Sequence, residues 1–395
     1  MADSPLLEAF AACLPGVEPF LAQELAELGY VHAANAPSYL PGEGGVRFSS
    51  TLDGLYRANL WLRTANRVLL RLGHFHAIQF AELRRKAANL PWERYLAPGQ
   101  PVAIRSTCHH SKLYHSGAVS ERVLGAIGDR LEHAPEALTF DEEQPSAQLI
   151  LVRMENDECT ISLDMSGEPL HRRGYRLAVA KAPLRETVAA AMLYASGWDH
   201  RSPLLDPFCG SGVIPIEAAL LAARIPPGML RSFAFMNWPG YQAYRWENLK
   251  SKAAKKIHAP EGAISGSDRD AGAVQAAIEN AERAGVAQWI QFTQASVSAI
   301  QPPASPGWVV TNPPYGVRIS AGNDLRGLYA QFGNVLRNVC PGWHAAYLCN
   351  DERLASLTRL EFEKGVSLSN GGIPVKLTRA LVQDNLSNLE TAHKE

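Results

Sequence analysis

The distribution of hydrophobic positions changes near residues 166–185. Before this segment, short apolar runs alternate with amphipathic stretches, which predicts small α+β units. We predict, in chain order, a strand, a helix, a long amphipathic stretch, a strand, a helix and a hairpin: Phe10–Leu14, Val17–Leu28, Leu52–Leu72, Pro101–Ser106, Ser116–Leu131, and Ala147–Met154 with Glu158–Asp164.

After this segment, apolar strands, turns and helices repeat regularly, which is typical of an α/β fold with a parallel sheet. The predicted strands are Pro203–Leu205, Ala263–Gly266, Trp289–Phe292, Trp308–Val310 and Ala345–Cys349. The predicted helices are Ile214–Arg224, Ala271–Ala284, Leu325–Asn338 and Glu352–Leu360. The runs Val366–Leu368 and Val375–Val382 flank an Asn-Gly pair, a strong hairpin signal, so we expect an antiparallel last strand.

Length and composition indicate a multidomain globular protein. A chain of 395 residues exceeds one ordinary core, and its 46% hydrophobic and 19% charged residues are those of a globular chain. No uninterrupted apolar run is long enough for a membrane span, and the first residues lack a secretory pattern, so we expect a cytoplasmic protein. Six cysteines without a Cys-x-x-Cys pair predict neither a disulfide framework nor a zinc site.

The charge distribution adds a candidate partner. Residues 57–122 carry eleven Arg and Lys residues against three Glu, a net charge of +8 inside a chain whose net charge is -1. Such a segment is typical of a phosphate-binding surface, and hence of a nucleic acid partner. The alternative is a solvated surface whose charges pair with acids from another domain.

A glycine-rich turn follows the first strand of the regular half. In Leu204-Leu-Asp-Pro-Phe-Cys-Gly-Ser-Gly, the turn glycines Gly210 and Gly212 allow close approach of a ligand, and the following helix start offers free N–H groups. Asp268 closes the next strand, where a carboxylate can accept both hydroxyls of a ribose. These positions predict a nucleotide-like cofactor, although the turn alone could be only a tight turn.

The insertion Pro226–Glu261 separates these two motifs. It interleaves aromatic residues with lysines, which would suit nucleic acid stacking. The alternative is an insertion packed by its own aromatics. The residues concerned are Trp238, Tyr241, Tyr244, Trp246, Lys250, Lys252, Lys255 and Lys256.

A third motif, Asn312-Pro313-Pro314-Tyr315, follows the fourth strand of the regular half. The two prolines make a rigid turn and leave carbonyls free. The side-chain oxygen of Asn312 and the carbonyl of Pro313 can each accept one N–H of an amino group, while Tyr315 stacks on the attached ring. Together with the first two motifs, this pattern predicts methylation of an exocyclic amine without a metal.

These motifs resemble the amino-methylating S-adenosylmethionine methyltransferases. More specific strings are similar to the THUMP-containing guanine-N2 RNA methyltransferases, most closely to the N-terminal half of the bifunctional 23S ribosomal RNA members: Cys13-Leu-Pro-Gly-Val-Glu-Pro-Phe-Leu, Ser111-Lys-Leu-Tyr-His-Ser-Gly and Lys181-Ala-Pro-Leu-Arg-Glu-Thr. The resemblance implies a ferredoxin-like region at 1–65, a THUMP RNA-binding domain at 66–165, a linker at 166–185 and a Rossmann-like class I methyltransferase domain at 186–395.

The resemblance also implies site roles. The methionine end of the donor would contact Asp206, Phe208, Gly210 and Gly212, and its ribose would bind Asp268. A segment closing over the donor would include Lys181, Pro183 and Thr187, and the catalytic clamp would be Asn312 to Tyr315. Two positions depart from the family: Ser296 stands where an Asp commonly binds the adenine, and Val317 where a Glu often follows the clamp.

Several alternatives stay open. The RNA would be ribosomal RNA or tRNA. The same clamp would also suit adenine-N6 or a protein glutamine amide as the methylated group. A non-enzymatic alternative is an RNA-binding protein that retains the donor fold without using it. The basic residues that we expect to contact RNA are Arg84, Arg85, Lys86, Arg105, Lys112, Arg172 and Arg173. The oligomeric state does not follow from the sequence.

Overall fold

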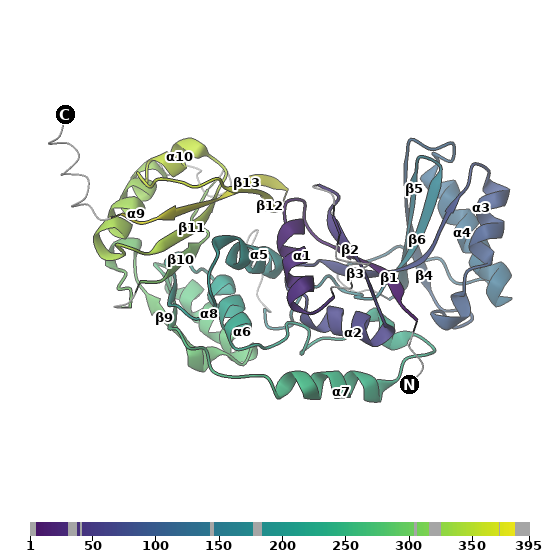
Figure 1. Cartoon of the computed structure of the whole chain (residues 1–395), viewed down its shortest axis with the longest axis horizontal. Coiled ribbons are helices and arrows are strands. Elements are labelled where there is room, and N and C mark those ends of the chain that lie inside the picture. Colours follow the sequence, from purple (N-terminus) through teal and green to yellow (C-terminus); the bar gives the residue numbers. More distant parts are fainter. Residues whose placement is uncertain are drawn as a thin grey trace. The chain divides into compact units, whose positions relative to one another are not determined.

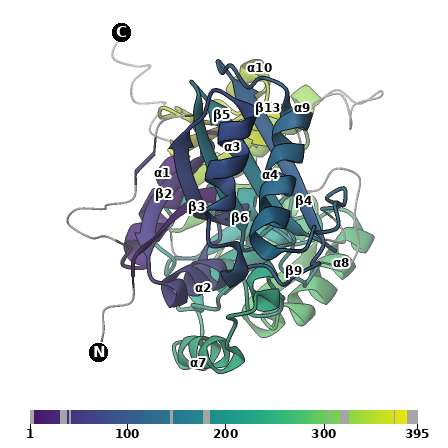
Figure 2. The same cartoon turned by 90° about the vertical axis from the view of Figure 1, so that its right-hand side faces the viewer.

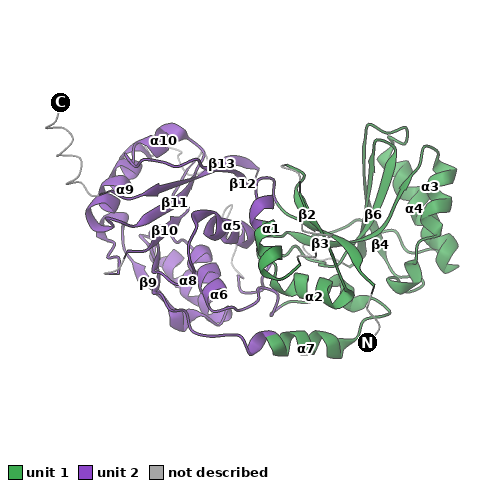
Figure 3. Cartoon of the chain, viewed as in Figure 1, with its two compact units in different colours: residues 1–13, 21–170, 231–252 green, residues 14–20, 171–230, 253–395 purple. Residues whose placement is uncertain are grey.

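The computed structural model describes residues 5–30, 38–39, 42–142, 146–176, 184–303, 306–315, 325–370 and 372–383. These residues form two compact units. The first takes in residues 1–13, 21–170 and 231–252, and the second takes in residues 14–20, 171–230 and 253–395. Figure 1 shows the elements and Figure 3 the two units.

The first unit is built on a sheet of the order β2-β1-β3-β6-β5-β4. Neighbouring strands are antiparallel except β4 and β5, which are parallel. Helices α3 and α4 pack side by side, and α4 contacts β4 (Figures 1 and 2). The bounds are β1 Leu7–Ala12, β2 Gly45–Ser50, β3 Arg67–His76, β4 Val102–His109, β5 Gln148–Glu155, β6 Glu158–Asp164, α1 Glu18–Glu27, α2 Leu52–Trp61, α3 Phe80–Ala88 and α4 Ser116–Leu131.

The long amphipathic stretch predicted at Leu52–Leu72 is wrong, because helix α2 ends at Trp61 and strand β3 begins at Arg67. The buried carboxylate of Glu24, from α1, accepts hydrogen bonds from the backbone N–H groups of Arg63 and Thr64 at 2.6 and 3.1 Å. This contact fixes the chain where the helix stops. It depends on a residue about 40 positions earlier, so local periodicity could not reveal it. The predicted hairpin, by contrast, is confirmed as β5 and β6.

The second unit has a seven-stranded sheet of the order β12-β13-β11-β10-β7-β8-β9. The strands from β11 to β9 are parallel, and β13 is antiparallel to both β11 and β12, as the Asn-Gly signal predicts. The bounds are β7 Leu204–Asp206, β8 Ile264–Asp268, β9 Ile290–Gln294, β10 Trp308–Thr311, β11 His344–Cys349, β12 Val366–Asn370, β13 Ile373–Leu381, α5 Glu186–Ser196, α6 Val213–Ala222, α8 Ala271–Arg283, α9 Leu325–Val339 and α10 Glu352–Ser356.

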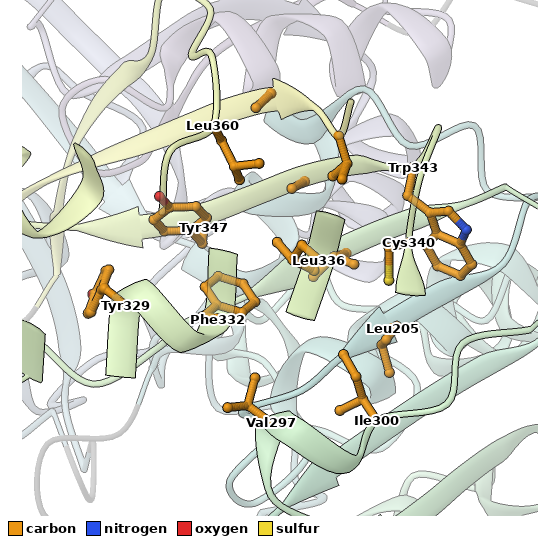
Figure 4. Close-up of a cluster of buried hydrophobic side chains, with 14 of the residues drawn as sticks. Leu205, Val297, Ile300, Tyr329, Phe332, Leu336, Cys340, Trp343, Tyr347 and Leu360 are labelled. Atoms are coloured by element: carbon orange, nitrogen blue, oxygen red, sulfur yellow. The ribbon is translucent and has the colours of Figure 1, made fainter. Parts of the chain in front are cut away.

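One buried cluster supports this sheet beneath the site. Figure 4 shows Phe332 and Leu336, from α9, close to Tyr347 of β11. Burying such side chains stabilises the fold by roughly 1.5–3 kcal/mol each. The cluster joins β10, which leads into the motif Asn312–Tyr315, to α9. Within the described ranges, no helix has the length and apolarity to cross a membrane.

Residues 231–252 of the insertion belong to the first unit and pack within it through their aromatic side chains. The rings of Phe235 and Tyr56 stack with centroids 4.2 Å apart, and Nε1 of Trp238 donates to Oε1 of Gln148 at 2.9 Å. Trp238 and Trp246 are buried, which confirms the packing alternative for these two rings. Helix α7 (Ala243–Ala254), which the sequence analysis did not predict, contains Trp246.

Candidate donor and catalytic site

Three parallel strands bring the predicted motifs to one edge of the second sheet. Strands β7, β8 and β10 end at Asp206, Asp268 and Thr311, in adjacent positions of the sheet order β10-β7-β8. In a doubly wound sheet, ligands bind beyond the carboxyl ends of the strands. The glycine-rich turn, the acidic residue and the clamp therefore belong to one candidate site.

The glycine-rich turn has one crowded glycine and one open glycine. Gly212 has φ +82°, and an added Cβ would lie 2.8 Å from Cβ of Ala277. Gly210 has φ +50°, and an added Cβ would meet nothing within 4 Å. Gly212 is thus needed for packing of α6 against α8, whereas the space at Gly210 can admit a ligand next to the N-terminus of α6.

We predict that this pair separates folding from binding. Gly212→Ala should destabilise the fold by about 1–3 kcal/mol, because it combines a positive φ with a clash against Ala277. Gly210→Ala carries only the backbone strain, but its methyl group enters the space for the donor, so donor affinity should fall at least tenfold. Thermal unfolding and calorimetric titration with S-adenosylmethionine measure both effects. Full donor affinity in Gly210→Ala would contradict the assignment.

Two carboxylates hold the edge together. Oδ1 of the buried Asp206 accepts hydrogen bonds from Oγ1 of Thr311 and from the N–H of Phe208. Burial raises the pKa of Asp206 to about 7, against the opposing effect of these bonds. Oδ2 of Asp268 accepts from the N–H of Gly210 and Oδ1 from that of Asp270, each at 3.0 Å. The acids therefore shape the turn, and each oxygen of Asp268 keeps a lone pair for another donor.

Helix α8 supports the turn from behind through residues that the sequence analysis missed. Nδ2 of the buried Asn280 donates to the carbonyl of Ser211 at 3.0 Å, and its Oδ1 accepts from Nη2 of Arg283 at 2.6 Å. Nε of Arg283 donates to the carbonyl of Tyr175 at 2.8 Å. This pair ties the segment at Tyr175 to the glycine-rich turn. Its only sequence signal is a polar residue on the buried face of an amphipathic helix.

Asn280→Asp should test this support. The carboxylate keeps the acceptor for Arg283 but replaces the donor to Ser211 with an oxygen that faces a carbonyl. We expect a loss of about 1–3 kcal/mol in unfolding free energy, and a weaker donor affinity because the turn shifts. Chemical denaturation and donor titration measure these effects. As a control, Gln275→Glu changes an exposed amide on the same helix. It gives up a hydrogen bond to Glu279, so it should cost only about 0.2–0.5 kcal/mol and leave donor affinity unchanged.

The clamp at the end of β10 is held from two sides. The hydroxyl of Tyr329, on α9, donates to the carbonyl of Pro314 at 3.2 Å, and Nδ2 of Asn370, at the end of β12, donates to the hydroxyl of Tyr315 at 2.7 Å. Burial raises the pKa of Tyr315, so its hydroxyl stays protonated at neutral pH.

Asn312 is the chemically notable member of the clamp. Its Oδ1 is buried and has no hydrogen-bond partner in the described structure. Leaving a buried acceptor unsatisfied costs about 1–3 kcal/mol, a cost that a bound ligand with an N–H group would remove. The atom that the sequence assigns to the substrate amine is thus an acceptor without a donor.

Three of the remaining residues that we predict to contact the donor lie in the part of the chain that the structure describes. Thr187 is buried on α5, and Phe208 contacts Phe332 edge-to-face, with centroids 5.4 Å apart. Ser296 follows β9 and shares a hydrogen bond of 2.8 Å with Ser298. Lys181, Pro183 and the departure at Val317 lie outside the described residues. Where the structure is described, no cluster of three or more His, Cys, Asp or Glu residues could hold a metal.

One predicted RNA contact is wrong. Arg173 is 3% exposed, and its Nε lies 3.5 Å from Oε1 of Glu217, which is also buried. The guanidinium is therefore part of the interior of the second unit and cannot reach a phosphate. Arg172, next to it, is half-buried.

Four of the eleven cations of the basic stretch form ion pairs with described residues of the first unit. Arg67, Arg84 and Arg105 form ion pairs with acids at later positions of the same unit, so the expectation that such acids would come from another domain is wrong; these acids are Asp164, Asp129 and Glu142. Lys86 pairs with Glu82. Arg85 and Lys112 are exposed. The surface charge available to RNA is consequently smaller than the count of +8 indicates.

Comparison with known proteins gives the family. The profile of the RMKL-like methyltransferase domain matches residues 173–379, more than half of the chain. The RlmL ferredoxin-like domain matches residues 8–69, and the THUMP domain matches residues 77–164.

Relatives agree along the whole chain. It is 36% identical over 388 residues to the ribosomal RNA large subunit methyltransferase K/L of Syntrophotalea carbinolica, with 95% of this chain and 53% of the relative covered. It is 35% identical over 376 residues to a Synechocystis protein provisionally named as an RNA methyltransferase, with 94% and 95% covered. The chain spans about half the length of the K/L relatives that it matches.

Solved structures have the same fold. A Listeria monocytogenes protein described as a predicted N6-adenine-specific DNA methylase has 32% identity and a TM-score of 0.84, with 95% of this chain and 96% of that chain covered. A provisionally described methyltransferase solved in complex with SAH has 29% identity and a TM-score of 0.82, with 96% and 98% covered. The chain therefore belongs to the RMKL-like methyltransferase family, and its C-terminal half has the S-adenosylmethionine-binding fold of that family.

Proposed function

We propose that this chain transfers a methyl group from S-adenosylmethionine to the exocyclic N2 amine of a guanine in RNA, in large-subunit ribosomal RNA. The observation that carries the proposal is the unpartnered, buried Oδ1 of Asn312 at the carboxyl end of β10. An amino group can complete this acceptor. Strand β10, which leads to Asn312, is the neighbour of β7, which leads to the glycine-rich turn.

The residues of the edge suit the donor. The open space at Gly210 and the start of α6 fit a carboxylate and a close backbone approach. Asp268 retains acceptor capacity for ribose hydroxyls, and Ser296 has a hydroxyl for the adenine end. The segment with Lys181 and Pro183, and Thr187 on α5, remain predicted donor contacts. No metal is required by this arrangement.

The clamp residues act on the amine rather than on the donor. S-adenosylmethionine supplies an electrophilic methyl group on a sulfonium. Asn312 accepts one N–H and so directs the nitrogen lone pair, while Tyr315, held by Asn370, stacks on the base. The new N–C bond forms as the S–C bond breaks, and the nitrogen then loses a proton to water. Such positioning lowers barriers by as much as roughly 7–11 kcal/mol.

RNA is favoured as the substrate by the THUMP match and by the names of the relatives. Because the K/L relatives are about twice as long, their ribosomal RNA substrate is carried over as part of this proposal, with tRNA as the alternative RNA. The Listeria structure, described as an adenine-specific methylase, makes adenine-N6 the second candidate reaction, since the same clamp fits that amine.

The test is transfer of labelled methyl from S-adenosylmethionine to unmodified ribosomal RNA, tRNA and DNA in parallel, followed by digestion and identification of the labelled nucleoside. N2-methylguanosine in ribosomal RNA is the expected result. N6-methyladenosine would retain the clamp and change the base, and label in tRNA would change the RNA. No transfer to any nucleic acid would overturn the proposal.

A further inference from the structure

The loop between β4 and α4 presents an aromatic ring to solvent. Tyr114 is 74% exposed, the highest value among the large hydrophobic side chains that the structure describes as exposed. It lies inside the segment that matches the THUMP domain. A single exposed apolar residue needs no explanation by itself, so the setting of this ring decides its meaning.

The loop is held rigidly. The N–H of Lys112 donates to Oδ1 of Asp157 at 2.6 Å, and the N–H of Asp157 donates to Oγ of Ser111 at 3.1 Å. The same hydroxyl donates to the carbonyl of His109 at 2.8 Å. Leu113 is only 4% exposed and anchors the loop from inside. With Leu113 pointing inward, the neighbouring Tyr114 is exposed, and the backbone of the loop is already ordered before a ligand packs on the ring.

The groups around Tyr114 are polar or charged rather than apolar. The side chain of the exposed Lys112 forms no ion pair with any described residue, and the exposed ring of His115 lies 5.6 Å from the Tyr114 ring. Strand β4 ends at His109, and His110 follows it. The Asp157 carboxylate already accepts the Lys112 N–H. An aromatic ring next to an unpaired cation fits a nucleotide, which offers a flat base and a phosphate together. A protein partner would instead call for a contiguous apolar patch.

We propose that Tyr114 stacks on an unpaired base of the RNA substrate and that Lys112 binds a neighbouring phosphate. This inference rests on the proposed function in taking RNA as the substrate. The contact recognises a single-stranded nucleotide, and it is sequence-tolerant because every base has a π-face. It is separate from the clamp, where the methylated base is held.

The other highly exposed tyrosine provides a matched control. Tyr244, on α7, is 67% exposed, but its hydroxyl is bonded to Gln242 and Arg245, and Arg245 pairs with Asp53. Its ring is therefore similarly exposed, but the cation bonded to it, Arg245, already has a carboxylate partner. Both residues can be replaced without removing buried side chains, so folding should be unaffected.

The experiment measures the Kd of the full chain for a fluorescent, unmodified ribosomal RNA transcript at several salt concentrations. Tyr114→Ala should weaken binding about 5- to 100-fold at every salt concentration, the range for loss of one base–aromatic stack. Tyr114→Phe should stay near the original affinity. Lys112→Ala should reduce the slope of log affinity against log salt by about one. Tyr244→Ala should bind as the unaltered chain does.

The outcomes separate this inference from the function. Equal affinity of Tyr114→Ala and the unaltered chain, with methyl transfer to RNA intact, overturns the stacking contact and leaves the function in place. An equal loss in Tyr244→Ala also overturns it, because the effect would then not be specific to this loop. A selective loss in Tyr114→Ala supports the contact even where no methyl transfer is found, in which case the proposed reaction alone fails. Thermal unfolding and donor titration of each variant show that the fold and the donor site are unchanged.

Discussion

Asn312→Ala should reduce methyl transfer by at least about 10²-fold while donor affinity stays within about twofold. The Oδ1 atom accepts no hydrogen bond in the described structure, so we expect it to accept one only when the substrate amine is bound. Without this acceptor, the amine loses the contact that orients its lone pair, and misplacement by about 1 Å costs on the order of 10²-fold. Single-turnover methyl transfer and calorimetric donor titration are the two measurements.

The same variant should keep or slightly raise its thermal stability. Removing a buried acceptor that has no partner removes a cost of about 1–3 kcal/mol, against a small loss of packing. Residues that reduce stability are typical of functional sites. Asn312→Asp, which keeps an acceptor oxygen, should retain more activity than Asn312→Ala. A large fall in unfolding temperature for Asn312→Ala would show a structural role and contradict the assignment.

The parallel sheet could be predicted because its strands are short, buried apolar runs. Strands β7 to β11 and helix α8 are recovered within a few residues, since burial on both faces leaves a continuous hydrophobic pattern. Helix α5 was missed for the same reason. Almost every residue from Glu186 to Ser196 is buried, so the helix has no polar face and no periodic signal.

The three motifs of the site could be predicted because each follows directly on a strand, and parallel strands end at one edge. What could not be predicted are the supports from distant segments. Thr311 bonds to Asp206, 105 positions earlier, and Asn370 bonds to Tyr315, 55 positions earlier. Arg173 was misassigned for a related reason. A charged residue is predicted to be exposed unless the partner that permits its burial is known. The partner of Arg173 is Glu217, 44 positions later.

Asp206→Asn should stabilise the fold above pH 7 and weaken donor binding at least tenfold. Burial raises the pKa of Asp206 to about 7 from an ordinary value of 3.8. The folded state therefore binds more protons than the unfolded state between about pH 4 and pH 7, and the free energy of unfolding falls as pH rises through this window. The amide can still accept from Thr311 and Phe208, but it carries no charge to desolvate. Donor binding should weaken because the variant removes the negative charge of the residue that we predict to contact the methionine end of the donor.

The gain in unfolding temperature should accordingly be small near pH 4, grow through neutral pH and level off above pH 7, at roughly 2–4 °C per kcal/mol. Thermal unfolding of both proteins from pH 4 to pH 9 measures this difference. Burial also raises the pKa of Glu186 to about 7, so the variant should keep part of the original pH slope, and Glu186→Gln is the matched control. That control should change the slope in the same direction but leave donor affinity nearly intact. It also removes the ion pair with Arg176, so its overall stability should fall where that of Asp206→Asn rises. If the difference in unfolding temperature between Asp206→Asn and the unaltered chain did not change with pH, Asp206 would already be ionised at low pH. Its hydrogen bonds would then stabilise the carboxylate more than burial destabilises it.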